Sequence, residues 1–328
     1  MDMGVEVLTT SGPISSLNSG VAIRNRIDAW NPTHFREAVT EIRAANPDIV
    51  HLQYPTAEYG AGLLPQMLVS LRRPFVVTIH EASIAHILRK ASLYPFLMFV
   101  DHLITPTRFE ADFMSRMYPP VRKKLSVVPV GSNIPMVPSR DRKQSIVYFG
   151  LIAPKKGLED FLRLAERAQD AGVAWDFVLI GQTQPRHLAY AAGLRDVSRH
   201  LPVEWLSGLP EREVANHLAE SGAVYLPFPD GASLRRGSLV AALVNGAPVI
   251  TTRGSATPKD LMQDQSVVAL ADSPEDAFDS AGEILSDSEL AEKLSLGARR
   301  YGERFSWSRI AAQHVELYEE MLVTGKQR

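Results

Sequence analysis

The order of hydrophobic and polar positions predicts an α/β protein. Short apolar runs rich in β-branched residues alternate with stretches in which apolar residues recur every three or four positions. The first pattern is typical of buried parallel strands, and the second of amphipathic helices that cross over between them. In the first half the predicted strands are 5–9, 49–53, 75–79, 102–105 and 125–129, with a helix over 34–45.

A second series of the same kind follows the polar, proline-containing segment 136–144, which is typical of a linker. Its predicted strands are 145–149, 175–180, 203–205, 223–226, 248–251 and 267–270, and its helices are 158–171, 211–219, 238–245 and 274–286. The predicted fold is therefore two doubly wound, Rossmann-like α/β domains over 1–139 and 140–306, facing across a cleft. A C-terminal helix within 307–328 is expected to pack across their junction. Such domains place a ligand at the carboxyl ends of their strands.

Composition narrows the class of protein. In 328 residues, 45% are hydrophobic and 22% charged, as in soluble globular proteins. The net charge of −2 provides no field that would attract nucleic acid, so we expect no nucleic-acid partner. The absence of cysteine excludes disulfides and thiolate ligands and fits a reducing compartment. No apolar stretch reaches the roughly 20 residues of a membrane span, and the N-terminus lacks a signal-peptide pattern, so a cytoplasmic location is predicted.

Paired cations mark the first half, at Arg72-Arg73, Arg89-Lys90 and 122–124. They are either solvated surface residues or a site for an anionic acceptor or a lipid surface. The second interpretation predicts peripheral contact of the N-terminal domain with the inner face of a membrane.

The first candidate for chemistry is Lys156. A predicted strand ends at Gly150, and the lysine comes just before a predicted helix, where free N–H groups and the helix dipole favour an anion. Lys156 is thus placed either as a phosphate ligand or as an ordinary surface lysine. The Walker pattern is not met.

A second strand also leads into a loop, which brings a basic segment to a predicted helix start. Ser233, Arg235, Arg236 and Gly237 lie on this loop, and Ser238 is placed as the helix cap. A serine, a glycine and two arginines suit an anion, although the arginines could also be solvated turn residues. With the Lys156 turn, the loop could hold a diphosphate.

Seven motifs, none specific alone, follow one another in the order typical of one enzyme family. They are PDIVHLQ at 47–53, VTIHE at 77–81, VVPVGSN at 127–133, VYFG at 147–150 with PKKG at 154–157, VLIG at 178–181, GAPVITT at 246–252, and FSW at 305–307 with LYE at 317–319. Over nearly its whole length the chain resembles the GT-B glycosyltransferases of family 4. These are retaining enzymes that take a sugar from a nucleotide-sugar donor.

The resemblance implies roles for particular residues. Lys156 corresponds to the lysine on the donor diphosphate, Gly150 and Gly181 to glycines of close approach, and His80 to the histidine near the transferred sugar. Judged from the residues alone, His80 follows a buried strand and is either a site residue or a hydrogen-bonded loop histidine. The implied partners are a nucleotide-sugar donor and a glycan, lipid-linked or small-molecule acceptor.

The chain departs from the family pattern at three places. Two glutamates usual in the family correspond to Ser233 and Ala241, and the arginine that usually follows the strand glycine is missing, so Arg235 or Arg236 is a substitute. The segment 4–10 resembles the family's second strand, so we expect that the first strand and its loop and helix are missing.

The predicted activity is hexosyl transfer, in which Lys156, Arg235 and Arg236 stabilise the leaving diphosphate. No Asp-x-Asp occurs, so we predict that no metal and no other cofactor is needed. A nicotinamide dehydrogenase is disfavoured because the lone Gly60-Ala-Gly62 lacks the third glycine. A nucleotide-sugar epimerase would need carboxylates in the cleft beyond Glu81. The remaining alternative is a degenerate nucleotide-sugar-binding or scaffolding protein.

Overall fold

The computed structural model describes residues 3–11, 21–56, 59–60, 62–71 and 74–325. The chain forms two compact units. Unit 1 comprises residues 1–128 and 312–328, and unit 2 comprises residues 129–311. The long helix α13 (Trp307–Gly325) begins in unit 2, and its larger part belongs to unit 1. Each unit is described by itself.

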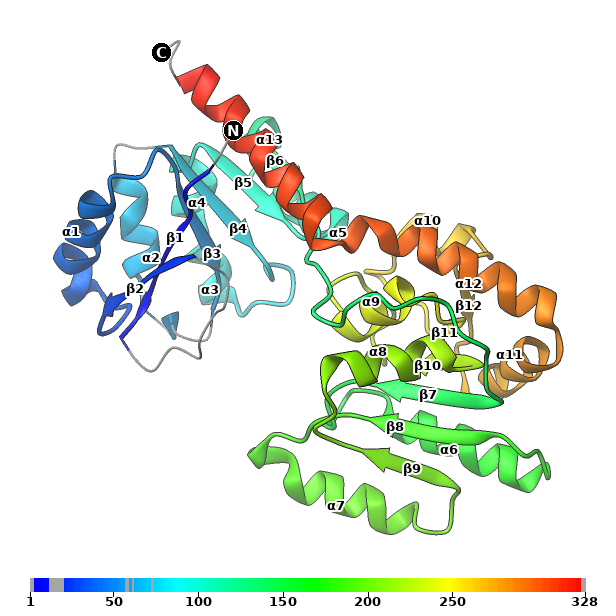
Figure 1. Cartoon of the computed structure of the whole chain (residues 1–328). Coiled ribbons are helices and arrows are strands. Elements are labelled where there is room, and N and C mark those ends of the chain that lie inside the picture. Colours follow the sequence, from blue (N-terminus) through cyan, green and yellow to red (C-terminus); the bar gives the residue numbers. More distant parts are fainter. Residues whose placement is uncertain (1–2, 12–20, 57–58, 61, 72–73, 326–328) are drawn as a thin grey trace. The chain divides into compact units, whose positions relative to one another are not determined.

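Unit 1 contains two parallel sheets (Figure 1). Its strands are β1 (Glu6–Thr10), β2 (Ala22–Ile27), β3 (Val50–Tyr54), β4 (Phe75–Ile79), β5 (His102–Thr105) and β6 (Leu125–Val127). Its helices are α1 (Phe35–Ala45), α2 (Leu64–Met67), α3 (Ile87–Ala91), α4 (Tyr94–Phe99) and α5 (Arg108–Met117), with 3-10 turns over Pro32–His34, Leu68–Ser70 and Pro119–Lys124. The sheets have the orders β1-β2 and β3-β4-β5-β6, and among the described residues no ladder joins them.

Unit 2 is built around one parallel sheet of order β12-β11-β10-β7-β8-β9. Its strands are β7 (Ser145–Phe149), β8 (Asp176–Ile180), β9 (Val203–Leu206), β10 (Ala223–Leu226), β11 (Val249–Thr251) and β12 (Val268–Leu270). Its helices are α6 (Leu158–Asp170), α7 (Leu188–Val197), α8 (Glu211–Glu220), α9 (Gly237–Val244), α10 (Lys259–Gln263), α11 (Pro274–Ser286) and α12 (Ser288–Gly302), with 3-10 turns over Pro185–His187 and Glu303–Phe305. Helices α6 and α11 pack together on one face, and α8, α9 and α12 on the other (Figure 1).

Burial explains why these strands read as continuous apolar runs. All residues of β4 and β10 are buried, because helices or loops cover both faces of a parallel sheet. The predicted α/β fold class with two Rossmann-like sheets is confirmed.

Strand β2 was not predicted, because its sequence AIRNRI has two arginines and no apolar run. It is held by parallel backbone pairing with β1. An ion pair adds to this pairing, because the Arg24 guanidinium lies 2.5 Å from the Glu6 carboxylate on β1.

The polar segment 136–144, predicted as a linker, is tied to unit 2. The backbone N–H of Val137 donates to Asn245 Oδ1 at 3.0 Å, and the Arg142 guanidinium donates to the Ser221 carbonyl at 2.8 Å. Lys143 Nζ lies 2.6 Å from the Glu220 carboxylate. These contacts fix the approach of the chain to β7 and so to the loops beyond that strand.

Candidate functional site

The strand order of unit 2 determines where a ligand is expected. Strand β7 lies between β8 and β10, and the connections leave these central strands in opposite directions. In an open α/β sheet such a switch point leaves a crevice outside the carboxyl ends of the strands. The loops at that position are 150–157 after β7 and 227–236 after β10, which carry Lys156 and the two arginines.

The two loops are in direct contact. Lys155 and Gly157 have φ angles of 62° and 81°, so the turn that carries Lys156 has two left-handed residues. A Cβ atom on Gly157 would lie 1.8 Å from the carbonyl oxygen of Pro227. The Tyr148 hydroxyl donates to the Lys156 carbonyl at 3.0 Å and fixes the turn from below. The structure therefore brings together two basic segments that lie about eighty residues apart in the sequence.

Gly150 and Gly181 serve the packing of neighbouring strand ends. A Cβ on Gly181 would lie 2.2 Å from the Gly150 carbonyl oxygen, and a Cβ on Gly150 would lie 3.0 Å from the Tyr148 hydroxyl. Both positions therefore favour glycine for reasons within the protein. Their approach to a donor, implied by the resemblance, stays a prediction.

The loop after β10 is fixed by its own polar contacts. Ser233 is 3% exposed, and its hydroxyl accepts the backbone N–H of Arg235 at 3.3 Å. The Arg236 guanidinium is paired with Asp230 and lies over the ring of Phe228, 4.6 Å from its centroid. Ser233 is therefore a loop-forming residue, and Arg236 is held in place by an aromatic ring and a carboxylate.

The prediction of Ser238 as a helix cap is wrong. Helix α9 begins at Gly237, its N-cap is Arg236, and no side chain caps it. Ser238 thus lies in the first turn, where its backbone N–H is one of the donors left free by helix geometry. Loop 227–236 reaches the helix one residue earlier than predicted because Ser233 and Arg236 close a turn, in which Arg236 N–H donates to the Ser233 carbonyl at 2.9 Å.

The two helix starts differ in charge. Helix α6 has Glu159 and Asp160 in its first turn, and these carboxylates already compensate the positive end of its dipole. Helix α9 has no acidic residue in its first turn and follows two arginines. An anion is therefore better accommodated at α9, with Lys156 supplied by the adjoining turn. The two positions that correspond to the family's glutamates are both buried, with Ser233 3% and Ala241 0% exposed.

His80 lies in unit 1, directly after β4. Its backbone N–H donates to the Tyr54 carbonyl at 2.8 Å, and its Nε2 lies 2.8 Å from Gln53 Oε1. The pKa of His80 is lowered by burial, and the neighbouring Glu81 carboxylate offsets only part of this effect. His80 is thus anchored at the carboxyl end of a central strand, where α/β sheets bind ligands.

Glu110, which sequence reasoning missed, holds the loop that follows His80. Its carboxylate accepts the backbone N–H groups of Ala82 and Ser83 at 3.1 and 3.0 Å and the Ser83 hydroxyl at 2.6 Å. The residue is 0% exposed. The spacing Thr107-x-x-Glu110 is typical of a helix start, and Thr107 does cap α5, but the glutamate is used on the loop instead.

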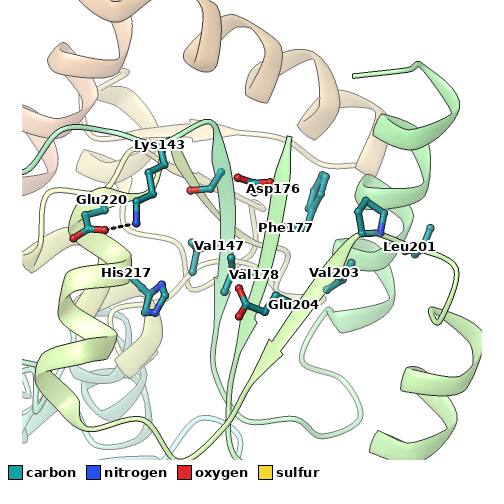
Figure 2. Close-up of a pocket in the computed structure, with 12 residues that line it drawn as sticks. Lys143, Val147, Asp176, Phe177, Val178, Leu201, Val203, Glu204, His217 and Glu220 are labelled. Atoms are coloured by element: carbon teal, nitrogen blue, oxygen red, sulfur yellow. Dashed lines mark ion pairs between the residues drawn. The ribbon is translucent and has the colours of Figure 1, made fainter. Parts of the chain in front are cut away.

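A hollow of about 570 Å³ in unit 2 lies away from these loops (Figure 2). It is bordered by the first residues of three strands, Ser145, Asp176 and Val203, and by His217 and Glu220 of α8. Figure 2 shows Lys143 reaching Glu220 at its margin. It is therefore at the amino ends of the strands, opposite the predicted site. Within the described ranges, no three His, Asp or Glu side chains gather as a metal site.

A buried histidine on β3, His51, predicts that the free energy of unfolding depends on pH. Burial lowers the pKa of His51 to about 3, against about 6.5 in an unfolded chain. Between these values the unfolded state binds a proton that the folded state does not, so the free energy of unfolding falls as the pH falls below 6.5. His80 and His102 shift in the same direction, also because of burial.

We expect His51→Gln to reduce the slope of this loss by up to about 1 kcal/mol per pH unit between pH 6 and 4. Urea unfolding at several pH values measures it. The exposed His200 provides the control, His200→Gln. An equal slope in wild type and His51→Gln would contradict the assignment.

Two family models match the chain in sequence. Residues 5–134 match Glycosyltransferase Family 4, and residues 143–287 match Glycosyl transferases group 1. A curated relative, the MMP alpha-(1->4)-mannosyltransferase of Mycolicibacterium hassiacum, is 24% identical over 94% of this chain and 81% of its own length.

Solved structures share the fold. The Anabaena protein Alr3699/HepE, in complex with UDP and glucose, has a TM-score of 0.72 at 14% identity and covers 97% of this chain and 100% of its own. A glycosyltransferase from Rickettsia africae has a TM-score of 0.71 at 14% identity and covers 92% of this chain and 85% of its own.

Two Rossmann-like sheets, the matched models and these neighbours define the class: a glycosyltransferase of the GT-B fold. The chain belongs to the family 4-like glycosyltransferases, enzymes that transfer a sugar from a nucleotide-sugar donor.

Proposed function

We propose that this enzyme transfers a hexose, with retention of its anomeric configuration, to a glycan or lipid-linked acceptor. The observation that carries the proposal is the contact between the Lys156 turn and loop 227–236 at the start of α9. This arrangement presents fixed cations and free backbone N–H groups at one end of the sheet. The similar Anabaena protein was solved with UDP and glucose, and a relative is a mannosyltransferase, which supports a hexose donor.

Each group has a separate part in the proposed reaction. As the nucleoside diphosphate leaves, negative charge develops on its β-phosphate. Lys156, the N–H groups at the start of α9 and Arg235 or Arg236 stabilise that charge. Arg236 is preorganised by Asp230 and Phe228, so its guanidinium does not have to be ordered during the reaction. His80, on unit 1, is assigned to the transferred sugar through the resemblance.

A panel of nucleotide sugars tests the function. We expect one donor to raise the thermal midpoint, because a ligand at 100 times its Kd stabilises by about 2.7 kcal/mol. That donor is then used in transfer to oligosaccharide and lipid-linked acceptors, and the anomeric coupling of the product is read by proton NMR. Inverted product would contradict retention. Donor binding with no transfer to any acceptor would favour the degenerate binding protein, the alternative suggested by Ser233 and Ala241.

The proposed mechanism predicts transfer without a divalent metal. Fixed cations replace the metal as the stabiliser of the leaving diphosphate, so excess chelator is expected to change the rate by less than about twofold. The measurement is initial transfer rate with and without EDTA. Loss of activity in EDTA and its return with Mg²⁺ or Mn²⁺ would contradict the prediction.

We also propose that unit 1 contacts a lipid surface through residues 84–99, which include helices α3 and α4. Ile84, Ile87, Leu88 and Phe99 are 65%, 69%, 74% and 64% exposed. Residues 82–100 contain Arg89 and Lys90 and no acidic residue, which suits anionic lipid. None of the described helices is long and apolar enough to cross a bilayer.

We expect binding to vesicles that contain anionic lipid, and a loss of about tenfold or more in Leu88→Glu. Cosedimentation with phosphatidylcholine vesicles, with and without phosphatidylglycerol, measures it. The control is Leu188→Glu, at a residue 60% exposed on α7 of unit 2. Equal binding of both variants would place the contact elsewhere.

A further inference from the structure

A chain of hydrogen bonds within unit 1 leads from helix α13 to His80. Tyr318 Oη lies 2.5 Å from His51 Nδ1. The other ring nitrogen, His51 Nε2, lies 2.8 Å from Thr78 Oγ1 and 3.2 Å from Gln53 Nε2. Gln53 Oε1 in turn lies 2.8 Å from His80 Nε2. Strand geometry makes this possible, because His51 and Gln53 are two residues apart on β3 and so project to the same face.

The donor and acceptor atoms determine the direction of each hydrogen bond in this series. An amide nitrogen can only donate, so Gln53 donates to His51 Nε2. This ring nitrogen is then the unprotonated one, and the Thr78 hydroxyl also donates to it. The proton of His51 is then on Nδ1, from which it is donated to Tyr318 Oη. Burial lowers the pKa of His51 to about 3, which keeps the ring neutral and leaves it with this single proton. His51 therefore presents a fixed acceptor to Gln53.

The amide of Gln53 transmits this orientation to His80. Because its nitrogen faces His51, its oxygen faces His80, where a carbonyl oxygen can only accept. The proton of neutral His80 is consequently on Nε2, and Nδ1 carries the lone pair. Glu81 lies beside His80, and His314 lies beside His51, with the His314 and His51 ring centroids 5.6 Å apart.

We propose that Gln53 is a positioning residue for His80. Held by His51, it fixes the plane and the tautomer of the His80 ring, so that Nδ1 is the nitrogen available to a bound substrate. Through His51 the arrangement is anchored on Tyr318 of α13. The orientation and tautomer of the His80 ring follow from the hydrogen bonds alone, whereas their effect on catalysis rests on the proposed role of His80.

Histidine NMR tests the structural part without any substrate. In protein with nitrogen-15-labelled histidine at pH 7.5, we expect His51 as the Nδ1–H tautomer and His80 as the Nε2–H tautomer. His51 as Nε2–H would mean that the Gln53 amide points the opposite way, and the proposal would be overturned.

Three forms of residue 53 test the coupling. The Gln53 side chain is exposed, so Gln53→Leu and Gln53→Glu should fold. An acceptor on Nε2–H stabilises the imidazolium, and a carboxylate does so more strongly, so the pKa of His80 should rise in the order Gln53→Leu, wild type, Gln53→Glu. His102, whose Nε2 lies 2.8 Å from Ser126 Oγ on the same sheet, is the internal reference and should not change. An identical His80 titration in all three forms would overturn the proposal.

The kinetic test uses the donor found in the panel. We expect Gln53→Leu to lower kcat about 10-fold to 100-fold, as loss of orientation does, with the donor KM within about twofold. Ser126→Ala, which removes the partner of His102, should leave both constants unchanged. If the NMR results hold and kcat does not change, the positioning of His80 stands and its assigned part in transfer fails.

Discussion

Gly157→Ala is expected to destabilise unit 2 more than Gly172→Ala, the same change at a left-handed glycine with open space around it. The new Cβ meets two penalties. A φ of 81° costs an L-residue about 1–2 kcal/mol, and the Cβ would lie 1.8 Å from the Pro227 carbonyl oxygen, which adds about 1–3 kcal/mol of overpacking. We therefore expect a loss of about 2–5 kcal/mol in urea unfolding, followed by the fluorescence of Trp175 and Trp205.

Gly172→Ala is the matched control. Its φ of 67° carries a similar conformational penalty, but no atom lies within 4 Å of the added Cβ. The difference between the two variants isolates the contact of the Lys156 turn with loop 227–236. Equal losses would show that the two loops separate at no cost, and the geometry of the proposed diphosphate site would be wrong.

Lys156→Ala is expected to weaken binding of the nucleoside diphosphate by about 1.5–3 kcal/mol, which is roughly 10-fold to 150-fold. The physical reason is the loss of a charge-assisted contact at a site that has few other cations. Calorimetry with the nucleoside diphosphate of the donor measures it, and the double variant Arg235→Ala/Arg236→Ala tests the opposite side of the site.

Lys155→Asn is the control for Lys156→Ala. It removes the neighbouring charge on the same turn, and asparagine tolerates the left-handed backbone at φ 62°. We expect it to change the affinity by less than about threefold. Unchanged affinity in both Lys156→Ala and the double arginine variant would remove these residues from the donor site.

The sequence by itself determined the fold class and most of the strands. The predicted limits are those of the structure for strands β4, β5, β7 and β10 and for helix α11. The reason is that buried parallel strands and amphipathic helices each have a hydrophobic pattern that is visible in the sequence. Lys156 and the arginines were predicted as site residues for a local reason as well, since a cation between a strand and a helix start is visible in sequence, and their role in binding stays a prediction.

Strand β2 and the start of α9 were decided by tertiary structure. The two arginines of β2 hide the hydrophobic pattern of a strand, and this strand forms because it pairs with β1, where Arg24 contacts Glu6. At α9 the turn from Ser233 to Arg236 sets the first helical residue, so capping preference at Ser238 was overruled. In both cases a hydrogen bond outside the element outweighed local propensity.

The relation between distant residues could not be read from the chain. The Gly157 contact with Pro227, the grip of Glu110 on the loop after β4, and the path from Tyr318 through His51 to Gln53 each join residues that no period or spacing connects. Sequence patterns record which side chains are buried and where elements start. Which polar atom meets which depends on the order of strands in the sheet, because that order sets the neighbours of every loop.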